Sequence, residues 1–208
     1  MIISNDFIFF HNPKTGGNTV NSLFYKNQHK LALSGKHPGV NAFKAAGCKV
    51  EIRHGHPFVD GVLFWHMSLA FVAKRIDLSG KFVFTFVRNP YTHFYSLYCE
   101  THKPGVDFDS WCKVKASANM SQKKYTHLNG KLHVDFVGKT ETLNADLERI
   151  CKVINVDYNR KEDRRRRNNI PCYTQEQARA IEKSYGDDFE VFGYSRDYSQ
   201  WLDADERR

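Results

Sequence analysis

The chain has 208 residues, of which 41% are hydrophobic and 26% charged, and 31 Lys and Arg against 23 Asp and Glu give a net charge of +8. This length suits one soluble domain with a sizeable core, and an aromatic content of 14% argues against disorder. No stretch approaches the roughly 18 consecutive apolar residues of a membrane span, and we recognise no signal peptide. We therefore expect a single domain over residues 1–208, located in the cytoplasm and without a membrane partner.

The five cysteines are scattered and form no Cys-x-x-Cys pair, which predicts free thiols and no metal site. The positive charge indicates an anionic partner, which could be nucleic acid, a nucleotide or an acidic substrate. Charge alone does not distinguish these classes.

Strand-like and helix-like segments alternate along the chain. The apolar run Phe7–Phe10 predicts a buried strand, and a helical stripe of Val20, Leu23, Phe24 and Leu31 follows it. A second strand is expected at 81–88, with a helix from Pro90 to about Thr101. Further strands are expected at 62–65 and 132–137, and further helices at 68–76, 143–154 and 174–185, the last with a Thr174–Gln177 capping box. This order predicts an α/β fold, a three-layer sandwich whose central parallel sheet is flanked by helices.

The loop after the first strand, residues 11–19, reads His-Asn-Pro-Lys-Thr-Gly-Gly-Asn-Thr. In such sheets ligands bind beyond the carboxyl ends of the strands. Glycines let backbone amides point inward, the following helix N-terminus favours an anion, and Lys14 adds a positive charge, so the loop predicts a phosphate or sulfate site. The alternative is a simple glycine-rich turn with Lys14 in solvent.

The loop differs from that of nucleoside triphosphatases, because its lysine precedes the glycines. The second strand also ends in Arg88 rather than in a carboxylate that could hold magnesium, which argues against a kinase or ATPase. Arg88 can bind a phosphate through paired hydrogen bonds, and Ser96, in the following helix, can add a hydroxyl if its face turns to the same pocket. Taken singly, a structural arginine and a surface serine would be the simpler interpretation.

Together, Pro-Lys-Thr-Gly-Gly-Asn-Thr at 13–19 and Arg-Asn-Pro-x-x-x-x-x-Ser at 88–96 resemble the two nucleotide-binding motifs of the carbohydrate-type (Golgi-type, family 2-like) sulfotransferases. Those enzymes use 3′-phosphoadenosine 5′-phosphosulfate (PAPS) and release 3′-phosphoadenosine 5′-phosphate (PAP). Segments 136–147 and 173–194 extend the resemblance. It implies a P-loop-like sheet, a 3′-phosphate bound by Arg88 and Ser96, and a 5′-phosphosulfate bound by Lys14, Thr15, Gly16, Gly17, Asn18 and Thr19.

The chain departs from this family's pattern at two positions. Asn18 stands where the family more often has Thr, and it can still donate a hydrogen bond. His93 stands where the family commonly has Arg, and we assign it no role.

Sulfuryl transfer to a hydroxyl needs a general base, and ten histidines are candidates. We expect His66 to be the base, because it lies between a predicted strand and helix, where the resemblance also places a histidine. His54 and His56 are the alternatives, and His11 is expected to support the phosphate loop. We predict that Lys14 and His66 are the catalytic residues of an in-line displacement. Lys14 and the loop amides would stabilise charge on the transferred group.

Residues 160–167, Arg-Lys-Glu-Asp-Arg-Arg-Arg-Arg, carry the densest charge in the chain. Such runs occur in nucleic-acid-binding proteins, but no reading helix or aromatic sheet face accompanies this one. We expect Arg167 to close over the nucleotide instead.

The predicted function is a PAPS-dependent sulfotransferase acting on a hydroxyl acceptor, with a saccharide expected. The alternatives are a nucleic-acid or polyanion-binding module that uses Arg164–Arg167, and a nucleotide kinase-like enzyme. Acceptor recognition is expected in the loops at 31–47 and 103–129.

Overall fold

The computed structural model describes residues 1–27, 37, 39–158 and 173–199. The chain divides into two compact units, each built from two chain segments: Met1–Val87 with Lys124–Arg164, and Arg88–Lys123 with Arg165–Arg208. No helix among the described residues is long and apolar enough to span a membrane. Leu31, Arg167 and the rest of the run at 160–167 lie outside the described residues.

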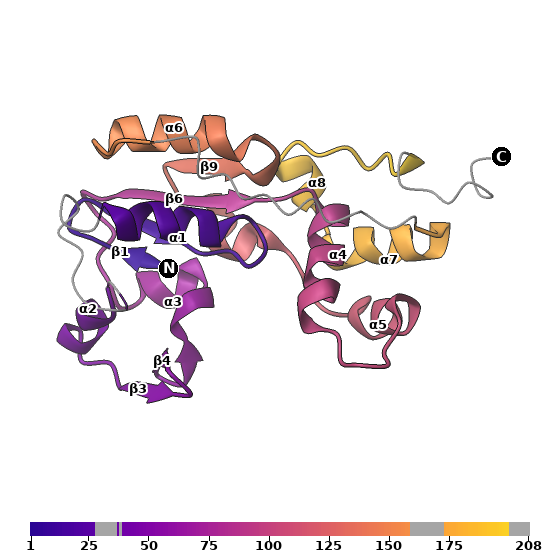
Figure 1. The fold of residues 1–208 in the computed structure, drawn as a ribbon, viewed down its shortest axis with the longest axis horizontal. Helices are drawn as coiled ribbons and strands as arrows, with labels where there is room; N and C mark the ends of the chain where they lie inside the picture. The colour runs from indigo at the N-terminus through magenta and orange to yellow at the C-terminus, as the bar shows by residue number, and fades with distance from the viewer. Residues whose placement is uncertain (28–36, 38, 159–172, 200–208) are drawn as a thin grey trace. The chain divides into compact units, whose positions relative to one another are not determined.

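A four-stranded sheet forms the centre of the first unit, in the order β1–β2–β6–β9 (Figure 1). The strands β2 (Phe7–Phe10), β6 (Phe82–Val87) and β9 (Phe136–Lys139) are parallel neighbours. The expected parallel arrangement is confirmed for these three. β1 (Ile2–Ile3) pairs with β2 in the antiparallel direction and makes the sheet mixed.

Helices cover both faces of this sheet. Side chains alternate along a strand, so Phe7 and Phe9 of β2 face one core while Ile8 and Phe10 face the other. Burial on both sides explains why β2 is apolar throughout. The core that contains Phe7 and Phe9 also contains α1 (Gly17–Lys26) and α6 (Leu143–Val153), and the short turn η3 (Thr140–Thr142) precedes α6. The core that contains Ile8 and Phe10 also contains α2 (Val40–Ala45), α3 (Leu69–Ala73) and the 3₁₀ turn η1 (Phe64–His66).

Two predicted strands were partly wrong, because short apolar runs do not separate strands from turns. The segment 62–65 contributes only two residues to a strand before η1 begins, and 132–137 is divided between two strands. The predicted helix at 68–76 is shorter, with Ser68 as the cap of α3. The smaller antiparallel sheets are β3 (Val50–Arg53), β4 (His56–Val59) and β5 (Val62–Leu63), and β7 (His127–Leu128) with β8 (Lys131–Leu132).

The second unit is helical in its described residues. Tyr91, Phe94, Trp111 and Tyr185 belong to its core. The predicted start and end of α4 are confirmed, and so is the Thr174–Gln177 capping box of α7. Its elements are α4 (Pro90–Thr101), α5 (Phe108–Lys115), α7 (Gln175–Tyr185) and α8 (Asp188–Val191), and the turn η2 (Gln122–Tyr125) begins in it.

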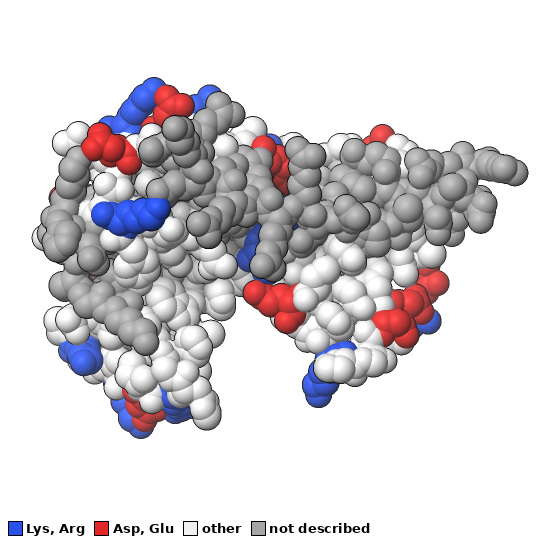
Figure 2. Space-filling model, in the orientation of Figure 1, with Lys and Arg blue, Asp and Glu red and all other residues white. Residues whose placement is uncertain are grey.

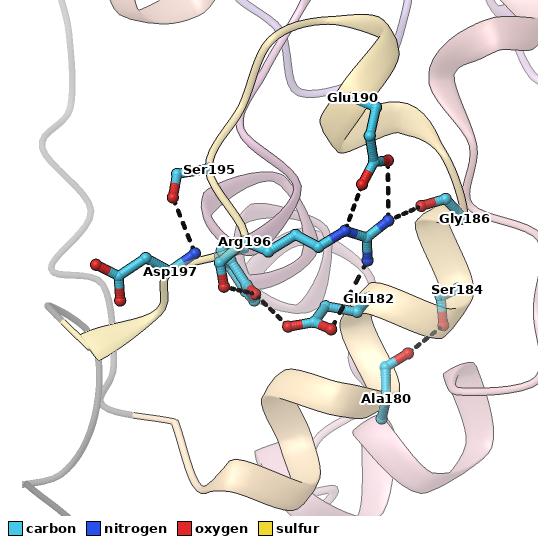
Figure 3. Close-up of polar contacts among 9 residues, drawn as sticks. Ala180, Glu182, Ser184, Gly186, Glu190, Ser195, Arg196 and Asp197 are labelled. Atoms are coloured by element: carbon cyan, nitrogen blue, oxygen red, sulfur yellow. Dashed lines mark hydrogen bonds and ion pairs between the residues drawn. The ribbon is translucent and has the colours of Figure 1, made fainter.

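Arg196, in the segment after α8, binds acidic side chains of α7 and α8 (Figure 3). Its guanidinium pairs with Glu190 at 2.6 and 2.9 Å, lies 3.7 Å from Glu182, and donates to the Gly186 carbonyl at 2.9 Å. The Tyr91 hydroxyl donates to Glu182 at 2.8 Å. Tyr91 lies in the first turn of α4, so this network holds the start of α4 against α7.

Candidate functional site

The loop that connects β2 to α1 leads into a helix N-terminus that no side chain caps. Gly16 precedes α1 with a φ of 87°, and Lys14 also has a positive φ, of 59°. α1 has no side-chain cap and no acidic residue in its first turn, and the amides of Gly17 and Asn18 make no hydrogen bond within the described part of the chain. Side chains cap α3, α4, α5 and α7, while α2, α6 and α8 lack a side-chain cap as α1 does. The start of α1 is therefore suited to an anion.

Buried hydrogen bonds hold the loop in this shape. The Asn12 side-chain amide donates to the Phe86 carbonyl at 3.1 Å, and the Thr15 hydroxyl donates to the Asn12 carbonyl at 2.8 Å. Asn12 is 1% exposed and Thr15 is fully buried. The buried Thr15 side chain therefore stabilises the conformation of the loop. Lys14 is half-buried and Asn18 is exposed.

The His11 ring packs against the first residue of α1. A Cβ atom on Gly17 would overlap the imidazole, which also stacks on Phe9 at a centroid distance of 5.8 Å. The Nδ1 atom of His11 is buried and has no hydrogen-bond partner among the described residues. Burial lowers the pKa of His11 from 6.5 to about 2, so the ring stays neutral. This packing agrees with the expected supporting role of His11.

The buried neutral His11 makes the protein sensitive to acid. In the unfolded chain this histidine binds a proton near pH 6.5, whereas in the folded chain it does so only near pH 2, so stability falls as the pH falls below about 6.5. We expect His11 to remove about 2 kcal/mol of unfolding free energy between pH 7 and pH 5.

Urea unfolding at the two pH values measures this loss. In His11→Gln the loss of unfolding free energy between pH 7 and pH 5 should be smaller by about 2 kcal/mol. His54→Gln, at an exposed hairpin position, should lose as much unfolding free energy as wild type does. Equal losses in wild type and His11→Gln would show that His11 does not carry the effect.

His66, the residue predicted to be the base, contacts His11 at the start of the loop between β2 and α1. Its ring centroid is 5.2 Å from that of His11, and its Nδ1 atom is 3.3 Å from the His11 carbonyl oxygen. A carbonyl only accepts, so Nδ1 carries the proton and Nε2 keeps its lone pair. His66 is exposed at the end of η1, where a substrate can reach it. His54 and His56 are exposed at the β3–β4 hairpin, whose turn places His54 at a φ of 49°.

Arg88, which follows β6, is the first residue of the second unit. The Arg88 Nε atom donates to the Thr92 hydroxyl at 2.9 Å. Thr92 and Ser96 are four residues apart in α4 and share one face. Ser96 is 2% exposed, and its hydroxyl makes no hydrogen bond with the described residues. His93 is buried, and its Nδ1 atom contacts the Tyr185 hydroxyl, so it belongs to the core of this unit.

Sequence reasoning missed Gln122. Its side-chain oxygen accepts from the Arg88 backbone N–H at 3.0 Å, and its side-chain nitrogen donates to the Arg88 carbonyl at 2.8 Å. Gln122 is 1% exposed. An isolated glutamine 34 positions along the chain carries no sequence signal for this contact.

The predictions for Arg164–Arg167 fall outside the described residues. On the face drawn in Figure 2, acidic and basic side chains of the described residues are interspersed. Within the described ranges, no three His, Cys, Asp or Glu side chains group in a way that could hold a metal ion.

Comparison with known proteins gives one match. Residues 3–195, nearly the whole chain, match the family model described as the sulfotransferase family. No curated protein and no solved structure matches the chain.

Proposed function

Because the chain belongs to the sulfotransferase family, we propose that it transfers a sulfuryl group from PAPS to a hydroxyl of a saccharide acceptor. The observation that carries this proposal is the uncapped N-terminus of α1, with Lys14 in the preceding loop and His66 beside it. The family match spans both units, which supports a single sulfotransferase domain with a P-loop-like three-layer arrangement.

The residues present fit such a donor. The open amides of Gly17 and Asn18 and the charge of Lys14 suit the 5′-phosphosulfate, with Thr15, Gly16 and Thr19 completing the loop. When bound, PAPS supplies the activated sulfuryl group. In the second unit, Arg88 and Ser96 would bind its 3′-phosphate, because Ser96 shares one face of α4 with Thr92, which accepts from the Arg88 Nε atom. Arg167 keeps its proposed role in closing over the nucleotide.

His66 would act as the general base. With Nδ1 held by the His11 carbonyl, Nε2 can accept the proton of the acceptor hydroxyl as that oxygen attacks sulfur. Lys14 and the loop amides would stabilise negative charge on the transferred group and on the departing phosphate, in line with the attack. β6 is followed by Arg88 rather than by a carboxylate that could hold magnesium, which supports sulfuryl transfer over a nucleotide kinase reaction.

Calorimetric titration with PAP, without added metal, tests the donor. Wild type should bind, and Arg88→Ala should bind about 10- to 100-fold more weakly, because charge-assisted hydrogen bonds to the 3′-phosphate are lost. Arg179→Ala, which removes the same charge from an exposed position of α7, is the matched control and should bind as wild type does. A folded wild type that does not bind PAP would contradict the proposal and favour a polyanion-binding module.

The saccharide acceptor is proposed from the resemblance to carbohydrate sulfotransferases. The segments expected to recognise it contain α2 and α5 in their described parts. Turnover of PAPS with a panel of saccharides, compared with phenols and simple alcohols, tests the acceptor class. Activity confined to phenols or simple alcohols would contradict a saccharide acceptor while leaving the donor proposal intact.

A further inference from the structure

We propose that Gln122 and Asp188 form a buried support that positions Arg88, and that this support gives the enzyme its preference for nucleotides with a 3′-phosphate. The inference rests on the proposed function, in which Arg88 binds that phosphate. All three residues belong to the second unit.

The Gln122 side chain supplies the backbone hydrogen bonds that a neighbouring strand would otherwise give to Arg88, the residue just after β6. β6 pairs with β9 as far as Val87, opposite Lys139, and Arg88 is the next residue. Both backbone hydrogen-bonding groups of Arg88 bond to the single side-chain amide of Gln122, at 3.0 and 2.8 Å. Because Gln122 is buried, losing its side chain would leave partly buried polar groups unpaired, which is costly.

Asp188 in turn fixes Gln122. Its carboxylate accepts from the Gln122 backbone N–H at 2.7 Å and from the Ser121 hydroxyl at 2.6 Å. Asp188 is fully buried at the start of α8, and burial raises the pKa of its carboxyl group. A buried carboxylate costs free energy unless donors surround it, and here both donors come from the segment that carries Gln122.

The side chain of Arg88 is held as well. Its Nε atom donates to Thr92, so the backbone and the base of the guanidinium are both fixed before a ligand binds. Bidentate binding of phosphate by arginine depends on such fixed geometry, and displacement of about 1 Å is enough to weaken it strongly. A loosened Arg88 should therefore lose affinity for a 3′-phosphate and not for the rest of the nucleotide.

The test compares PAP with adenosine 5′-monophosphate, which lacks the 3′-phosphate, by calorimetry on the full chain. For Gln122→Ala we expect the preference for PAP, the ratio of the two Kd values, to fall about 10-fold with the affinity for the monophosphate unchanged. Asp188→Asn should shift the ratio in the same direction. Gln175→Ala, the same substitution at an exposed position of α7, should leave it at the wild-type value.

Two further variants keep the test decisive. If Gln122→Ala does not fold, Gln122→Glu retains the oxygen that accepts from Arg88 but removes the donor to its carbonyl, and it should also lose preference. In Arg88→Ala, adding Gln122→Ala should cause no further loss of preference.

The outcomes separate this proposal from the one on which it rests. A wild type without preference for PAP would overturn the proposed function. A preference that Arg88→Ala abolishes but Gln122→Ala and Gln122→Glu retain would overturn only the support by Gln122. Equal weakening of both nucleotides in Gln122→Ala would also overturn it, because a merely structural residue acts on both.

Discussion

Replacing His66 with alanine should lower kcat by about 10²- to 10⁴-fold, the range over which general bases contribute, and should leave PAP binding at the wild-type level. The reason is geometric: the Nδ1 atom of His66 donates to the His11 carbonyl at 3.3 Å, so the ring's lone pair, which accepts the acceptor's proton, is on Nε2. His66 is exposed at the end of a short turn, so its loss should affect folding little. Turnover with PAPS and calorimetry with PAP measure the two quantities separately.

His56→Ala is the matched control, since His56 is also exposed in the first unit. It should retain turnover. Near-normal turnover by His66→Ala would exclude His66 as the base. A large loss in His54→Ala or His56→Ala would then place the base at the β3–β4 hairpin.

The parts of the fold that were predicted correctly are those with strong local signals. Pro90 at the first helical position and the Thr174–Gln177 box mark helix starts that need no tertiary information, and the structure places α4 and α7 there. Apolar runs buried on both faces gave β2 and β6 in the same way. In contrast, β1 and β5 are two residues long, and only their pairing partners define them.

The same distinction applies to the candidate site. Lys14 and the glycines after it form one continuous motif, so the sequence alone located the open start of α1. The role of Gln122 depends on a contact with Arg88 that crosses 34 positions, and that of Asp188 on one that crosses 66. No periodicity or spacing encodes such contacts, because the loops that make them are ordered by the packing of the whole unit.

Gly17→Ala should lower the free energy of unfolding by about 1–3 kcal/mol and turnover by about 100-fold, because the new Cβ atom overlaps the His11 ring. The ring cannot move aside without cost, since it stacks on Phe9 and lies edge-on to His66. Either the start of α1 shifts away from the phosphosulfate or the imidazole pushes His66 from its place. Thermal unfolding and turnover with PAPS measure the two effects, and Ser22→Ala, exposed on the same helix, should change neither.

Removing the ring identifies the cause. In His11→Ala with Gly17→Ala the overlap no longer exists, so the double variant should be more stable than Gly17→Ala alone and should recover part of its turnover. If the double variant is no more stable than Gly17→Ala, the overlap with His11 is not what makes glycine necessary at this position. Recovery of stability without turnover would instead show that the imidazole itself, neutral and wedged between the loop and His66, is needed to align the base with the bound donor.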